Sequence, residues 1–382
     1  MVKEIDIENI NSHIIAFPSV VGQEKIREDF SRALKNGRLA HSYIFSGNEG
    51  TGRNAMTIEL ARVLNCEYPL EQTIYDDCKC KNCTNIRKWN HPNLIPVIPM
   101  PKKDKVKDDV WQSIIEEFIK IKSNDVYAEF KSTGSGNILV ESIRNLRNRL
   151  SLVPDLVGYR VVVIQPASQM NIEAANALLK LLEEPPQRCI LILITDTTRS
   201  LLPTILSRCQ IIKFPPLKTL DVERELTVRK AIPPESAKRI ARLSFGSLSR
   251  AVAVLEENLL SDMEMSLDFL RASVTGNASK INSISEEVVK FDRQGQKRFY
   301  RCIQLWIMDA IIWKTHSDDE AEEKVYNFSN LDVVKKMSER YSLWQLEQSL
   351  RQIAEAILEI DANVLQNISV VSLAIRLKGI FR

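Results

Sequence analysis

Five short, nearly continuous apolar segments in the first half of the chain constrain its fold more than any other feature of the sequence. They comprise residues 43–45, 94–98, 161–164, 190–194 and 211–212. Strands buried on both faces of a parallel sheet have this pattern, because helices cover both faces and leave no polar side. The first 215 residues or so are therefore predicted to form an α/β domain around an open parallel sheet.

Helical spacing of apolar residues takes over after Pro215-Pro216 and continues almost to the end of the chain. We predict three domains: an α/β domain of residues 1–215, a small helical domain of residues 216–260 and an all-α domain of residues 261–382. Residues 102–136 begin with a basic run and end in Gly and Ser, which indicates an insertion with some helix and a flexible exit.

The composition excludes some classes of protein. The 52 Lys and Arg residues against 49 Asp and Glu give a net charge of +3, too little to bind nucleic acid unaided. No apolar stretch approaches the ~20 residues of a membrane-spanning helix, and the N-terminus lacks the pattern of a signal peptide, so we expect a cytoplasmic protein without membrane contact. Trp306, Trp313 and Trp344 lack interleaved basic residues and are expected to fill a helical core.

A loop with the glycine spacing of a phosphate-binding loop follows the first apolar segment. Its glycines are Gly47, Gly50 and Gly52, and they lie between a predicted strand and a predicted helix. A working loop ends in Lys and then Ser or Thr, because the ammonium contacts the β- and γ-phosphates and the hydroxyl binds Mg²⁺. Arg53 and Asn54 occupy these two positions here, and neither side chain reproduces those contacts.

The second half of such a nucleotide site is missing as well. The apolar segment 161–164 should end in acidic residues for metal and water, yet it continues Gln165-Pro166-Ala167-Ser168. We therefore predict a degenerate nucleotide loop that does not hydrolyse ATP. Binding of nucleotide through the backbone N–H groups of the loop stays open, since the glycines are present.

Four of the seven cysteines, Cys66, Cys78, Cys80 and Cys83, lie within eighteen residues. In a reducing compartment such a cluster indicates a metal rather than disulfides, and four thiols suffice for a closed, structural zinc site. The alternatives are four reduced thiols without metal and a redox-active Cys80–Cys83 pair. The second would need a thioredoxin-like setting, whereas these residues are predicted to lie in a polar loop.

Two segments resemble the signature of the bacterial DNA polymerase III clamp-loader subunits. They read Ala-Asn-Ala-Leu-Leu-Lys-Leu-Leu-Glu-Glu-Pro-Pro at residues 175–186 and Leu-Ser-Arg-Cys at residues 206–209. Val-Gly-Gln at 21–23 and Leu-Ala-His-Ser-Tyr at 39–43 extend the resemblance to about residues 16–255. It implies an AAA+ α/β module that carries a zinc module, a helical lid, and a C-terminal collar that holds a ring of subunits together.

The resemblance leaves two kinds of subunit, the ATP-hydrolysing tau/gamma motor and the non-hydrolysing delta prime stator. The degenerate nucleotide loop favours the stator. Ser249 supports this choice, because a motor is expected to have a nucleotide-sensing arginine at that position. An active motor is the alternative, and an unrelated zinc-binding interaction module is a third interpretation.

The resemblance also implies partners and site residues. Motor subunits of the tau/gamma type, a delta-like subunit, the sliding clamp and primer-template DNA would be reached through the complex. Arg208, next to Ser207, would act as an arginine finger on the γ-phosphate held by an adjacent subunit; otherwise Arg208 is a cation at a helix end. Because the family spaces its last three cysteines differently, either Cys78 or His91 completes the metal site.

Overall fold

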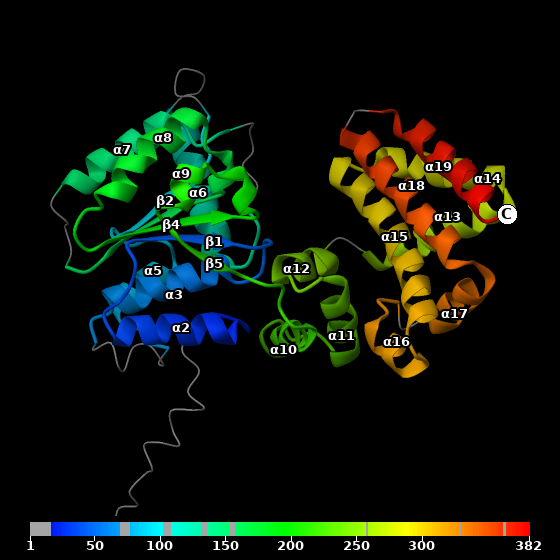
Figure 1. Cartoon of the computed structure of the whole chain (residues 1–382), viewed down its shortest axis with the longest axis horizontal. Helices are drawn as coiled ribbons and strands as arrows, with labels where there is room; N and C mark the ends of the chain where they lie inside the picture. Colours follow the sequence, from blue (N-terminus) through cyan, green and yellow to red (C-terminus); the bar gives the residue numbers. More distant parts are fainter. Residues whose placement is uncertain are drawn as a thin grey trace, which may run out of the picture. The chain divides into compact units, whose positions relative to one another are not determined.

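The computed structural model describes residues 17–68, 77–101, 108–130, 136–152, 157–256, 259–327, 330–361 and 364–382. The chain forms two compact units, Met1–Val252 and Ala253–Arg382 (Figure 1). The basic run at 102–107 and the predicted exit of the insertion at 131–135 lie outside the described residues. The division into three domains stays a prediction.

A five-stranded parallel sheet forms the centre of the first unit. Its strands are β1 (Ser42–Ser46), β2 (Leu94–Val97), β3 (Arg160–Ile164), β4 (Cys189–Thr195) and β5 (Gln210–Lys213), in the order β2-β3-β4-β1-β5. All four neighbouring pairs are parallel. Each apolar segment predicted to be a strand forms one of these five, so the predicted parallel α/β fold is confirmed. The expected burial on both faces is wrong for β5, an edge strand in which Ile211 is 40% exposed.

Helices cover both faces of this sheet. In Figure 1, α7 (Val140–Ser151) and α8 (Ile172–Glu183) lie on one face, and α2 (Glu24–Lys35) and α3 (Arg53–Asn65) lie on the other. Every residue of β3 and β4 is buried as a result. Helix α8 begins where the side chain of Asn171 accepts a hydrogen bond from the backbone of Ala174, and it ends just before Pro185-Pro186.

The strand order brings three strand ends together. Because β4 lies between β3 and β1, the segments that follow these three strands meet at one edge of the sheet. In open α/β sheets, ligands bind at the carboxyl ends of the strands. The glycine loop after β1, Gln165 after β3 and Asp196 after β4 are therefore neighbours at the edge where a site is expected.

Among the described residues, six further helices lie in the first unit or begin there. They are α5 (Lys81–Arg87), α6 (Asp108–Asn124), α9 (Pro203–Leu206), α10 (Thr219–Arg229), α11 (Pro234–Leu243) and α12 (Leu248–Glu256), the last of which continues into the second unit. Helix α6 gives the insertion the helix expected from its sequence.

The second unit consists of helices alone in its described residues. They are α13 (Leu259–Thr275), α14 (Ala278–Lys290), α15 (Arg293–Thr315), α16 (Asp318–Lys324), α17 (Leu331–Arg340), α18 (Leu343–Asp361) and α19 (Gln366–Ile380). Trp306 is buried and donates to the carbonyl of Met263, as expected of a core residue. The same expectation is wrong for Trp344, which is 63% exposed in the first turn of α18. No described helix is long and apolar enough to cross a membrane.

Candidate functional sites

The glycine loop has the backbone of a phosphate-binding loop. It joins β1 to α3, and Gly50 and Gly52 have φ angles of +77° and +105°, which favour glycine. A Cβ atom on Gly50 would lie 2.4 Å from Oγ of Ser247 and 2.5 Å from the backbone nitrogen of Ser249. The loop therefore packs tightly against the start of α12, and Ser249 is one of the residues that face it.

Hydrogen bonds fix this loop to two other segments. Gln23 donates its side-chain amide to the carbonyl of Thr51 at 2.9 Å and to that of Pro215 at 2.8 Å. The backbone N–H of Leu248 donates to the carbonyl of Gly50 at 3.0 Å. Residues 21–23 and Pro215, which are far apart in the sequence, thus meet at the loop and hold its shape.

Arg53, at the position of the phosphate-binding lysine, is committed to carboxylates of the same chain. Its side chain is 3% exposed, with Nη1 2.9 Å from Oδ1 of Asp196 and Nη2 2.9 Å from Oε2 of Glu49. Both terminal nitrogens of the guanidinium therefore have an anionic partner. A phosphate group would have to displace Glu49 or Asp196 to reach this cation.

The groups that would hold magnesium and activate water are absent from their expected places. Strand β3 is followed by Gln165 and Pro166, as the sequence predicts, and the buried Nε2 of Gln165 has no hydrogen-bond partner. Asn54 follows Arg53 in the first turn of α3, and its buried Oδ1 also has no partner. Asp196, a carboxylate that was not predicted from the sequence, lines the same cavity as Gln165 and forms an ion pair with Arg53.

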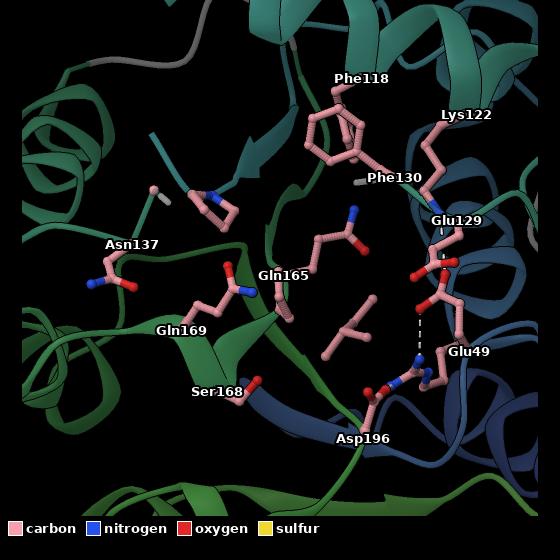
Figure 2. A pocket seen from close by; sticks show the side chains of 15 residues that line it. Glu49, Phe118, Lys122, Glu129, Phe130, Asn137, Gln165, Ser168, Gln169 and Asp196 are labelled. Carbon is pink, nitrogen blue, oxygen red and sulfur yellow. Dashed lines mark hydrogen bonds and ion pairs between the residues drawn. The ribbon is translucent and has the colours of Figure 1, made fainter. Parts of the chain in front are cut away.

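The insertion contributes a second cation to the same place. Lys122 of α6 is 2% exposed, and its Nζ lies 3.6 Å from Oε1 of Glu49 and donates to the carbonyl of Ala128 at 2.6 Å. Burial lowers the pKa of Lys122, and the carboxylate of Glu49 partly opposes this shift. Glu49 therefore links Arg53 to Lys122. Figure 2 shows Glu49 and Lys122 side by side at the edge of the site.

A cavity of about 740 Å³ lies beside this ion-pair network. The insertion supplies one wall with Phe118 and Phe130, whose rings meet edge to face at 5.2 Å. Gln165 and Asp196 belong to the opposite side (Figure 2). The insertion is thus part of the candidate nucleotide site, a position that the sequence did not predict.

Tyr127, also from the insertion, fixes this segment to the domain. Its buried hydroxyl accepts from the backbone N–H of Val21 at 2.8 Å and donates to the carbonyl of Ser19 at 3.2 Å. Burial raises the pKa of Tyr127. Lys230, at the end of α10, forms an ion pair with Asp125 at 2.8 Å. The insertion therefore contacts both the segment before α2 and the end of α10.

Replacement of Tyr127 by Phe should lower the free energy of unfolding of this unit by about 1–2 kcal/mol, because the backbone N–H of Val21 and the carbonyl of Ser19 lose their buried hydrogen-bond partner. For a unit of this size, the melting temperature should fall by roughly 2–8 °C. Tyr159, whose ring is 36% exposed, offers the matched control, and Tyr159→Phe should change the melting temperature little. Equal stability of the two variants would refute the docking role of Tyr127.

Arg208 lies at the surface between α9 and β5, where the sequence placed it. Its side chain is 36% exposed and forms an ion pair with Glu183 at 2.7 Å. The hydroxyl of Ser207 accepts from Nη1 of Arg208 at 3.3 Å. The side chains of Ser207 and Arg208 are therefore in contact, and the arginine is accessible.

The four clustered cysteines meet in space. The Sγ atoms of Cys66, Cys78, Cys80 and Cys83 all lie within 4.8 Å of one another. Cys66 lies 3.6 Å from Cys78 and 3.9 Å from Cys80, between sulfur atoms. Four sulfurs around zinc at ~2.3 Å form a tetrahedron with edges of about 3.8 Å, so this donor set fits zinc.

Cys78, rather than His91, completes this cluster. His91 is buried outside the group, and its Nδ1 accepts a hydrogen bond from the backbone N–H of Asn93 at 3.2 Å.

Burial raises the pKa of Cys83. For Cys80 burial also opposes ionisation, but donation from the backbone N–H groups of Cys83 and Glu67 outweighs it and lowers the pKa to about 7.

The strand order and the glycine loop between β1 and α3 together define a nucleotide-loop α/β fold of the AAA+ class. The family model described as "DNA polymerase III, delta subunit" matches residues 22–218, just over half of the chain. The chain therefore belongs to this family of clamp-loader subunits.

Individual relatives agree with this assignment. The chain is 32% identical over 199 residues to the DNA polymerase III subunit tau of Bacillus subtilis, a match of 52% of this chain and 29% of the relative. It is 31% identical over 222 residues to the subunit delta' of the same organism, a match of 58% of this chain and 56% of the relative. The chain thus spans less than two thirds of the length of either relative.

Solved structures also match the chain. A gamma subunit-related protein of DNA polymerase III from Thermotoga maritima aligns with 93% of this chain and 99% of its own, at 16% identity and a TM-score of 0.40. The clamp-loader delta protein of Bacillus subtilis aligns with 91% of this chain and 99% of its own, at 12% identity and a TM-score of 0.30.

Proposed function

We propose that this chain is a non-hydrolysing subunit of a DNA polymerase III clamp loader. It assembles with tau/gamma-like and delta-like subunits and supplies Arg208 in trans to an ATP site of a neighbour. That ATP site would power the loading of the sliding clamp onto primer-template DNA during replication. The observation that carries the proposal is the capture of Arg53 by Glu49 and Asp196.

Three features of the loop support the absence of hydrolysis. The charge that should meet the β- and γ-phosphates is already neutralised within the chain. Gln165 and Asn54 stand where a carboxylate and a magnesium-binding hydroxyl are needed. Ser249, rather than an arginine, lies against Gly50. Each difference removes a separate part of the reaction, so restoring one would not restore turnover.

Arg208 remains suited to act on a phosphate held by another subunit. An arginine carries five N–H donors in a planar fork and keeps its charge at every physiological pH. The side chain of Arg208 is 36% exposed, so the guanidinium is accessible to another molecule. Arg208 can therefore assist hydrolysis of ATP bound to a neighbouring subunit, although this chain does not itself hydrolyse ATP.

An ATP-hydrolysing motor of the tau/gamma type is the second candidate, because curated relatives include subunits of both kinds. Zinc in the cysteine cluster is compatible with either. Hydrolysis by the isolated chain separates the two candidates.

The purified chain should release no phosphate from ATP with Mg²⁺ above the rate of its Gly52→Val variant. A side chain on Gly52, which has a φ of +105°, distorts the loop in a motor and in a stator alike. The rates of both proteins are measured at saturating ATP, with an active clamp-loader motor subunit as positive control. Turnover that Gly52→Val abolishes would identify the chain as a motor.

A further inference from the structure

The side chain of Arg208 is held almost completely by its own chain. Oε1 of Glu183, at the end of α8, accepts a hydrogen bond from Nε of the guanidinium at 3.0 Å and forms an ion pair with Nη2 at 2.7 Å. Nη1 donates to the carbonyl of Thr204 at 3.0 Å and to the hydroxyl of Ser207 at 3.3 Å. Three of the five N–H donors of an arginine are thereby hydrogen-bonded, Nη2 forms the ion pair, and the guanidinium has one defined orientation.

Ser42, the first residue of β1, and His41 directly before it fix the two members of this pair. The hydroxyl of Ser42, which is 1% exposed, donates to the backbone carbonyl of Arg208 at 2.7 Å. The ring Nε2 of His41 lies 3.1 Å from the carbonyl of Leu182, which can only accept, so the ring donates to the residue before Glu183. His41 and Ser42 thus anchor the end of α8 and the backbone of Arg208 to the start of β1.

We propose that Glu183 is a positioning residue that orients the guanidinium of Arg208 before a neighbouring subunit presents its phosphate. The inference rests on the proposed function of Arg208 and assigns a task to the His41-Ser42 segment, which fixes the distance between the two side chains. No other described side chain is within ion-pair distance of Arg208.

Glu183 has two opposing effects on Arg208: it orients the guanidinium, and it competes with the phosphate for it. A free arginine side chain loses rotamer freedom when it is immobilised on a ligand, and a side chain that is already oriented loses less. The ion pair with Glu183 opposes transfer to the phosphate, but an ion pair this exposed is weak because water screens it. Orientation therefore outweighs competition, and loss of Glu183 should slow the reaction that Arg208 assists.

The test compares Glu183→Ala, Glu183→Gln and Glu184→Ala in the reconstituted clamp loader, each with Arg208 and with Arg208→Ala. Glu184 is the matched control, since it is exposed at the same helix end and has no ion-pair partner among the described residues. The clamp- and DNA-stimulated ATPase is measured over a range of ATP concentrations, at matched assembly of all complexes.

Glu183→Ala should lower the Arg208-dependent part of kcat about two- to ten-fold without a matching change in KM. Glu183→Gln, which keeps an acceptor oxygen, should lie between Glu183→Ala and the wild type, and Glu184→Ala should equal the wild type. In the Arg208→Ala background, Glu183→Ala should have no further effect. Equal losses in the two backgrounds, or no loss with Arg208 present, would overturn the proposal.

A measurement on the isolated chain keeps this inference separate from the proposed function. The Nε–H signal of Arg208 in ¹⁵N NMR, assigned by its absence in Arg208→Ala, should show slow exchange with water in the wild type and fast exchange in Glu183→Ala. Identical exchange in both would show that Glu183 does not hold Arg208. A protected signal combined with full activity of the Arg208→Ala complex would instead refute the finger.

Discussion

Replacement of Cys83 by Ser should remove zinc from the protein and lower its melting temperature by about 10 °C or more. A structural zinc site contributes its binding free energy to folding, and a loss of several kcal/mol shifts the melting temperature of a unit this large by that amount. Cys83 is fully buried on α5, between the other three thiols and the body of the domain. No rearrangement at the surface replaces such a ligand.

The metal content and the effect of a chelator complete this test. Elemental analysis should find about one zinc per wild-type chain and none in Cys83→Ser. A chelator should lower the melting temperature of the wild type and leave that of the variant unchanged, because the variant has no zinc to lose. Wild-type protein prepared without chelator and found to lack metal would refute the zinc site.

The sequence predicted those parts of the fold that depend on local pattern. Each buried strand is a short apolar segment, because a strand with helices on both sides has no polar face. The glycines of the loop follow the end of β1, where their backbone angles are required. The four cysteines were recognisable from their scarcity and spacing alone, and the structure places all four together.

The partners of the functional residues were not predictable in the same way. Arg53 was identified as a departure from the phosphate-binding lysine, but its ion pair with Asp196 joins residues far apart in the sequence. Lys122 and Tyr127 lie in the segment predicted to be an insertion with some helix, and both are buried in contacts that the sequence did not indicate. Only the strand order and the docking of α6 determine these contacts. Trp344 shows the opposite error, because an apolar residue in a helical pattern can lie at the surface.

The insertion contributes a buried cation beside the nucleotide loop. Lys122 and Arg53 share the carboxylate of Glu49, so the charges around the loop balance without a phosphate. The arrangement agrees with a subunit that keeps the shape of a nucleotide site and contributes its chemistry elsewhere. That contribution, through Arg208, is the central claim.

Arg208→Ala should leave the chain folded and able to join its complex, yet lower ATP hydrolysis at the one site that borders it. Arginine fingers contribute ~10³–10⁵ in rate where they act. The total rate of a complex with several active sites should fall only by the share of that one site, and clamp loading should fall with it. Arg208→Lys should not restore the rate fully, since an ammonium lacks the fork of donors.

The most direct measurement is the clamp- and DNA-stimulated ATPase of the reconstituted clamp loader with wild-type chain, Arg208→Ala, or Arg199→Ala, an exposed arginine in the segment before α9 that serves as control. All three complexes are first matched for assembly and for melting temperature of the isolated chain. The account predicts a loss of hydrolysis and clamp loading with Arg208→Ala and wild-type rates with Arg199→Ala. Equal rates and equal clamp loading in all three complexes would contradict it and leave Arg208 as a cation at a helix end.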